Sequence, residues 1–115
     1  MAFNDLETQA IKNTVDAIFM AKRPPEAIRK ELDFGYRIEG QSILLFEISP
    51  HWRDSNQVFE HGVAKATYVK IQKVWKLYWM RQDLKWHRYE PFAESERLED
   101  VLRVVMDDEF GCFFG

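Results

Sequence analysis

Cysteine is almost absent from the 115-residue sequence, which contains only Cys112. A single cysteine excludes an internal disulfide, and it cannot by itself build a metal site. The sequence also lacks a run of about 18 apolar residues, so we expect no membrane-spanning helix. The first residues, MAFNDLETQ, lack the basic and apolar regions of a secretion signal. We therefore expect a cytoplasmic protein with no membrane partner.

The sequence also contains none of the common catalytic or cofactor motifs. It has no phosphate-binding glycine loop, no HExxH pattern and no paired-cysteine zinc pattern. His51, His61 and His87 are not at metal-ligand spacing, although His51 and His61 could meet across a loop. We therefore expect no metal and no cofactor. The sequence leaves open whether the protein is an enzyme, with a non-catalytic role favoured.

What is present is the composition of a folded protein. Apolar residues make up 46% of the chain, charged residues 30% and aromatic residues 15%, which argues against disorder and suits a core built on a sheet. The length predicts one domain over residues 1–115. The net charge of −3 is unevenly distributed, because residues 65–89 are strongly basic and residues 90–110 strongly acidic. These segments either neutralise one another or present two surfaces to two partners.

Residues 63–90, VAKATYVKIQKVWKLYWMRQDLKWHRYE, predict the centre of the fold. Two runs of aromatic and β-branched residues flank Gln82-Asp83, which is typical of a β-hairpin with a two-residue turn. In the register that such a turn imposes, Trp79 lies opposite Trp86.

Because side chains alternate along a strand, this sheet has two different faces. A further turn at Gln72-Lys73 makes residues 63–70 the neighbouring strand, with Ala66 opposite Trp79. The first face is apolar, and we expect it to form the core: Trp75, Leu77, Trp79, Leu84 and Trp86. The second face is amphipathic: Lys65, Lys76, Tyr78, Met80, Lys85, His87 and Tyr89.

Helices are predicted at both ends of the chain. Residues 1–33 form a helical region, in which Asn4 and Glu7 have the spacing of a capping box and a second short helix follows the two adjacent prolines. Residues 95–109 predict a C-terminal helix with Ser95 as its cap. We expect its apolar stripe to pack on the tryptophan face, and the apolar tail after it to be buried in the fold or in a partner subunit.

The sheet itself is predicted over residues 34–90. Glu39-Gly40 separates two further strands, in which one face is shared by Phe34, Tyr36, Ile38, Ile43, Leu45 and Glu47. The expected fold class is therefore α+β. It consists of an N-terminal helix or helix pair, an antiparallel meander of about five strands, and a C-terminal helix packed on one sheet face.

The amphipathic face predicts a non-catalytic binding module. Lysines interleaved with aromatic rings suit an acidic partner or single-stranded nucleic acid, because lysines meet phosphates and rings stack on bases. Long ordered loops are often functional, and residues 49–62 form such a loop. The candidate binding residues are Trp52, Arg53, Lys65, Lys76, Tyr78, Lys85, His87 and Tyr89.

Two alternatives stay open on the sequence alone. A small hydrolase or nuclease-like enzyme would use Glu47, Lys65 and His87 as its catalytic residues if they converged on one face with Tyr78. Glu47 equally fits a strand-end acid that reaches water or pairs with Lys65 or Arg53. The second alternative is self-association, in which the apolar tail or an exposed edge strand builds a homodimer.

Four segments carry a resemblance to a known family. They are GYRIEGQSILLFEISPHW, VAKATYVK, VWKLYWMRQDLKWHRYEP and the terminal GCFFG. Together they resemble the bacterial family known as domain of unknown function 3024, over about residues 34–115. The resemblance implies a small bacterial protein whose biochemical role is unassigned, and it supplies no catalytic residues to carry over.

Overall fold

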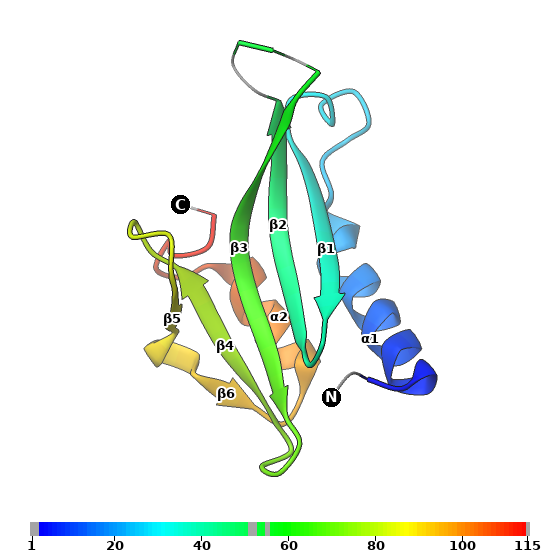
Figure 1. Cartoon of the computed structure of the whole chain (residues 1–115), viewed down its shortest axis with the longest axis vertical. Helices are drawn as coiled ribbons and strands as arrows, with labels where there is room; N and C mark the ends of the chain where they lie inside the picture. Colours follow the sequence, from blue (N-terminus) through cyan, green and yellow to red (C-terminus); the bar gives the residue numbers. More distant parts are fainter. Residues whose placement is uncertain (1–2, 51–52, 55, 115) are drawn as a thin grey trace.

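The structure, a computed structural model, describes residues 3–50, 53–54 and 56–114. Figure 1 shows one antiparallel sheet with two helices behind it. The strands follow the order β1-β2-β3-β4-β5, and a two-residue strand, β6, also pairs with β4. This confirms the predicted α+β fold, with six strands. In chain order the elements are α1 (Asp5–Ile18), the 3-10 helix η1 (Met20–Lys22), β1 (Asp33–Glu39), β2 (Ser42–Pro50), β3 (Val58–Val69), β4 (Val74–Met80), β5 (Trp86–Arg88), the 3-10 helix η2 (Glu90–Phe92), β6 (Glu94–Ser95) and α2 (Leu98–Asp107).

Helix α1 begins where the capping box predicts. The Asn4 side chain accepts a hydrogen bond from Glu7 N at 2.8 Å, and Glu7 Oε1 accepts one from Asn4 N at 2.9 Å. Ile11, Val15 and Phe19 recur at helical spacing and are buried in the core. The helix therefore covers the sheet with one apolar stripe. Neither helix in the described part of the chain is long and apolar enough to cross a membrane.

The segment between α1 and the sheet corrects the expected helix pair. Residues 26–31 form successive turns, such as the one closed by Ile28 N and Pro25 O at 2.8 Å, and no second helix. A helix this short needs an apolar face to bury, but Ile28 is 45% exposed. Arg23 instead anchors the segment to β1 through two hydrogen bonds of 2.6 Å to the Asp33 carboxylate.

The β1–β2 hairpin has the predicted faces. Gly40 closes its turn with a φ of +58°, in the left-handed region that favours glycine. Three cross-strand pairs confirm the predicted face: Phe34 with Glu47, Tyr36 with Leu45, and Ile38 with Ile43.

The β3–β4 hairpin keeps the predicted faces but not the predicted pairs. Its turn covers residues 70–73 instead of two residues, and Lys73 ends it with a φ of +55°. Ala64, not Ala66, therefore lies opposite Trp79. Because the shift is two residues, every side chain stays on its predicted face.

The β4–β5 hairpin differs from the prediction by one residue. Met80 pairs with Trp86 and Trp79 pairs with His87, whereas the two-residue turn placed Trp79 opposite Trp86. A one-residue shift moves every side chain of a strand to the other face. Trp86 therefore lies on the face away from the helices, and Tyr89 is buried on the helix side with 2% of its surface exposed.

A longer turn causes this shift. Leu84 N donates to Arg81 O at 2.9 Å, and Leu84 adopts a φ of +62°; this combination is typical of a three-residue hairpin loop. The Asp83 carboxylate stabilises the loop, because it accepts a hydrogen bond from Lys85 N at 3.0 Å and bonds His87 Nε2 at 2.8 Å. Leu84, which the sequence assigns to the core, is consequently 79% exposed in the turn.

The core lies between the two helices and the sheet face that they cover, which we call the covered face. Trp75 is buried there as predicted, and Trp79 packs partly buried against the same cluster. Burying a large apolar side chain contributes about 1.5–3 kcal/mol. The best-buried side chains come from both helical segments and the three central strands: Val15, Phe19, Ile43, Leu45, Val63, Leu77, Val101, Leu102 and Val105.

Helix α2 lies within the predicted residues 95–109 but is shorter, from Leu98 to Asp107. Its N-cap is Arg97 and not Ser95, whose hydroxyl instead accepts a hydrogen bond from Arg97 N at 3.2 Å. The predicted apolar stripe is buried at Leu98, Val101, Leu102 and Val105, so α2 packs on the sheet as expected.

Asp108 ends α2 and fixes the apolar tail. Its backbone is left-handed, with a φ of +44°, and its carboxylate accepts hydrogen bonds from Phe113 N and Phe114 N, both at 2.9 Å. The Phe113 ring lies 4.8 Å from the Tyr89 ring, and the Phe114 ring lies 5.6 Å from Phe34. Phe113 is therefore buried in its own chain, one of the two outcomes that the sequence allowed, whereas Phe110 is 62% exposed.

We predict that Asp108→Asn destabilises the protein. Asparagine tolerates the left-handed backbone, but it retains a single acceptor oxygen and loses the charge. We expect the free energy of unfolding, measured in urea, to fall by about 1–2 kcal/mol. Its exposed neighbour Asp107 provides the control, because Asp107→Asn should change the free energy of unfolding by less than about 0.5 kcal/mol. Equal unfolding midpoints for the two variants would show that the tail does not depend on Asp108.

Candidate binding surface on the open sheet face

The sheet face turned away from α1 and α2 is the candidate site, and we call it the open face. It faces the viewer in Figure 1, where no helix crosses it. Apart from Phe46, its side chains are half-buried or exposed, so a partner can reach them. The open face includes Arg37, Glu39, Ser42, Leu44, Phe46, Ile48, Glu60, Lys65, Thr67, Lys76, Tyr78, Met80, Trp86, Arg88 and Glu94.

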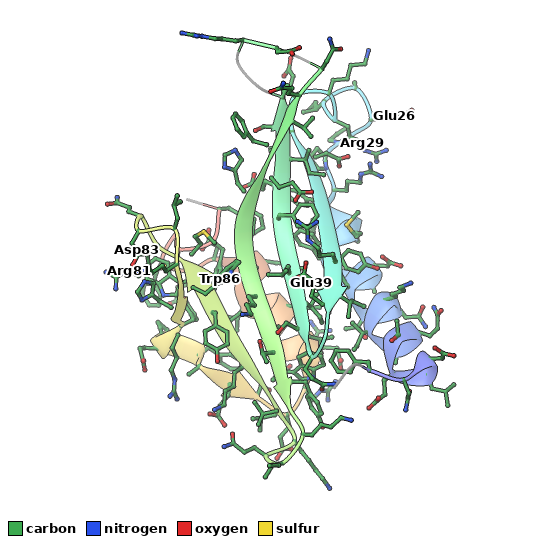
Figure 2. The ribbon with its side chains drawn as sticks, viewed as in Figure 1. Glu26, Arg29, Glu39, Arg81, Asp83 and Trp86 are labelled. Atoms are coloured by element: carbon green, nitrogen blue, oxygen red, sulfur yellow. The ribbon has the colours of Figure 1, made fainter. Side chains whose placement is uncertain are left out.

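The Trp86 ring lies against β3 because Gly62 leaves room for it. A Cβ on Gly62 would sit 2.9 Å from Cη2 of Trp86 and 3.1 Å from Cε of Met80, which is closer than ordinary van der Waals contact. Figure 2 shows Trp86 in front of the sheet, near β4 and β3. The indole is therefore a flat apolar surface that is held in place on the open face.

Phe46 is only 8% exposed, although it belongs to the open face. A Cβ on Gly35 would lie 2.6 Å from its ring, and the Arg37 guanidinium lies 4.8 Å from the ring centre. Arg37 also forms ion pairs with Glu60 and, at 3.4 Å, with Glu39. This end of the open face is therefore closed, and its cation is already neutralised.

Lys65 and Tyr78 occupy the middle of the open face. They lie directly opposite one another on β3 and β4, and Lys65 Nζ is 5.8 Å from the centre of the Tyr78 ring. Lys76 lies on the same face, two residues before Tyr78 on β4. Within the described residues, no carboxylate is within ion-pair distance of Lys65 or Lys76. Both ammonium groups are therefore available to an anionic partner.

The other predicted binding residues within the described ranges lie away from this face. Lys85 is exposed in the β4–β5 turn, His87 lies on the covered face, and Tyr89 is buried there. Arg53 is exposed in the loop between β2 and β3, and Trp52 lies outside the described residues. Of the predicted binding residues that the structure describes, Lys65, Lys76 and Tyr78 therefore share the open face and the rest do not.

Sequence reasoning missed Trp86 as a member of the open face. Two signals were present. Aspartate in a turn commonly bonds the backbone two residues further on, as Asp83 bonds Lys85 N, and this lengthens the turn. A glycine inside a strand marks a close approach of another group, as Gly62 does beneath the indole.

A comparison with known families agrees with the segments that carry the resemblance. The family described as Domain of unknown function (DUF3024) matches residues 3–115. The chain belongs to the DUF3024 family. The match includes α1, which lies outside residues 34–115. No curated protein and no solved structure matches the chain.

The DUF3024 fold does not bring the catalytic candidates together. Glu47 lies opposite His61 on the side of the covered face, whereas Lys65 points from the open face. His87 is on β5, three strand spacings from Glu47 on β2, which is about 14 Å and beyond the reach of a hydrogen bond. Among the described residues, no three His, Cys, Asp or Glu side chains form a group that could hold a metal. The geometry gives the hydrolase alternative no support.

We predict that Glu47→Gln raises the thermal stability of this DUF3024 protein at pH 7. Burial raises the pKa of Glu47 above its ordinary value of 4.5, and His61 opposes that shift more weakly. A carboxyl with a raised folded-state pKa stabilises the fold only when it is protonated, and this contribution is lost as the pH rises. Glutamine stays neutral, so the gain in Tm should be present at pH 7 and shrink as the pH falls towards 4.5.

The exposed Glu31 supplies the control for the Glu47 experiment. Glu31→Gln should leave Tm nearly unchanged across the same pH range. A lower Tm for Glu47→Gln at pH 7 would mean that the carboxylate is stabilised by a partner, in contradiction of the prediction.

Proposed function

We propose that this DUF3024 protein is a non-catalytic binding module whose open face holds single-stranded nucleic acid. The proposal is carried by the Lys65–Tyr78 pair, which sets a cation over a ring in the middle of a sheet face that no helix covers. Bases stack on aromatic rings and phosphates meet lysine side chains, so an adjacent ring and ammonium group suit a nucleotide.

Trp86 adds a second ring to this surface. Trp86 pairs with Met80, and Tyr78 pairs with Arg88, so the two rings are diagonal neighbours across β4 and β5. Diagonal neighbours in a sheet are about 7–8 Å apart. Successive bases of one strand could therefore stack on Tyr78 and Trp86, while the backbone of that strand runs past Lys65.

The charge on the open face supports this partner despite the net charge of −3. Lys65 and Lys76 have no carboxylate partner among the described residues, and Arg88 lies 3.9 Å from both Glu90 and Glu94. Exposed ion pairs of that length contribute little, so Arg88 can exchange them for a phosphate. The part of the open face around Tyr78 therefore offers about three cations, Lys65, Lys76 and Arg88, against one acid, Glu94.

The first test is the salt dependence of binding to a labelled single-stranded oligonucleotide. Displacement of counterions from three phosphates gives a slope of about −2 in log affinity against log salt for a single strand. The dissociation constant, measured by fluorescence anisotropy, should therefore rise roughly 20-fold between 50 and 200 mM salt. Polyglutamate serves as a competitor that carries charge without bases, and it should displace the oligonucleotide poorly.

Lys65→Gln tests the position of the site. It should weaken binding at 50 mM salt and reduce the salt slope by about 0.7, because one phosphate contact is lost. Lys12→Gln is the matched control, since Lys12 is exposed on α1, behind the sheet. If neither protein binds the oligonucleotide in a salt-dependent way, or if the two variants behave alike, the open face is not a nucleic-acid surface.

A further inference from the structure

A second site candidate lies on the opposite side of the sheet from the open face. A pocket of about 540 Å³ opens between β4, β5 and the apolar tail, a volume that is typical of small-molecule sites. Trp79 forms one wall from β4, while Phe110 and Cys112 form another from the tail. The hydrogen bonds of Asp108 to the tail hold this second wall in place.

Tyr89 supplies an unused hydrogen-bond donor in this pocket. The residue is 2% exposed, and its hydroxyl makes no hydrogen bond to any residue that the structure describes. Although the residue as a whole is buried, its hydroxyl oxygen is not among the fully enclosed, unpartnered atoms of the described residues, so the hydroxyl is open to the pocket and can donate to a ligand there. Tyr89 lines the pocket, so the residual surface of the side chain faces the space that a ligand would occupy. Burial, together with the nearby Cys112, Asp108 and Glu109, raises the pKa of Tyr89, which keeps the phenol protonated as a donor.

The other polar groups of the pocket favour an anion. Arg81 and Arg88 line it as cations and Glu90 as an acid. Arg88 lies 3.9 Å from Glu90 and Glu94, and His87 bonds Asp83. Arg81 forms no ion pair within the described residues, so it is the cation that a ligand would meet. The Arg81 guanidinium lies over the Trp79 ring, 5.4 Å from its centre, so the pocket has a cation in contact with a flat apolar surface. Such an arrangement fits a ligand that has both a ring and a negative group.

We propose that the pocket lined by Trp79, Arg81 and Tyr89 binds a small aromatic anion, with its ring against Trp79 and its carboxylate or phosphate on the Tyr89 hydroxyl and Arg81. Trp79 and Tyr89 point to the covered side of the sheet, so this site and the open face share only Arg88, which lines the pocket at the sheet edge. A ligand here would also contact the tail through Phe110 and Cys112, and would therefore stabilise the tail.

The test uses three probes on the full-length protein: 2-naphthoate, the neutral 2-naphthalenemethanol, and acetate. Cys112 is the only cysteine in the sequence and lines the pocket, so its rate of reaction with a thiol reagent reports occupancy. We expect 2-naphthoate to slow this reaction and to shift the Trp79 indole N–H signal in NMR spectra. The neutral probe should bind at least tenfold more weakly, and acetate should have no effect. A single-stranded oligonucleotide should leave Cys112 equally reactive.

Tyr89→Phe removes one oxygen and keeps the ring that packs on Phe113. It should weaken 2-naphthoate binding about tenfold, whereas Tyr78→Phe, the same change on the open face, should leave it unaltered. Arg81→Gln should also weaken binding, with the exposed Arg103→Gln as its control. The proposal is overturned if 2-naphthoate shifts the signal of Trp86 and not Trp79, if it neither protects Cys112 nor shifts any indole signal, or if the two tyrosine variants bind alike. None of these results depends on whether the open face binds nucleic acid.

Discussion

The burial of one sheet face beneath α1 and α2 is the constraint on which the rest of the molecule depends. Leu77 lies at the centre of that face and is fully buried, with Leu45, Ile43 and Val101 around it. Because side chains alternate along β4, an inward Leu77 requires an outward Tyr78. Burying leucine contributes about 1.5–3 kcal/mol, whereas an exposed cation–ring contact contributes about 0.5–1 kcal/mol. The burial of the core therefore determines which side chains point to the open face. The Lys65–Tyr78 pair lies there as a consequence of that burial.

At the outer edge of β4, where the sheet ends, two short strands complete the face that the helices cover. β5 and β6 cover that edge in two pieces, joined by η2. Leu77 bonds both pieces, because Leu77 O accepts from Tyr89 N at 3.0 Å and Leu77 N donates to Ala93 O at 2.9 Å. The backbone N–H and C=O groups on this edge of β4 thus find partners without a long sixth strand. The turn between the two short strands brings Tyr89 against Phe113. This ring contact packs the tail against the end of the core.

The elements that sequence reasoning predicted correctly are those with a repeated pattern or a strong local signal. The structure has three such features as expected: the apolar stripe of α2, the capping box of α1 and the turn at Gly40. The errors are at turns whose length depends on one or two side chains. Lys73 and Leu84 adopt left-handed backbone conformations without being glycine, which composition does not reveal. An error of two residues at the β3–β4 turn left every side chain on its predicted face. An error of one residue at the β4–β5 turn moved the side chains of β5 to the opposite face.

This inversion changes what the two faces can bind. The predicted register gave the open face His87 and Tyr89, and gave the core Trp86. The observed register replaces a titratable ring and a phenol on the open face with an indole, whose larger π-surface is the better stacking platform and carries no charge. It also moves Tyr89 beneath the tail, where its ring is buried against Phe113 and its hydroxyl has no hydrogen-bond partner among the described residues. The same three-residue loop thus creates the stacking surface on one side of the sheet and places the Tyr89 hydroxyl in the pocket on the other. A change that shortened this loop would be expected to abolish both sites together.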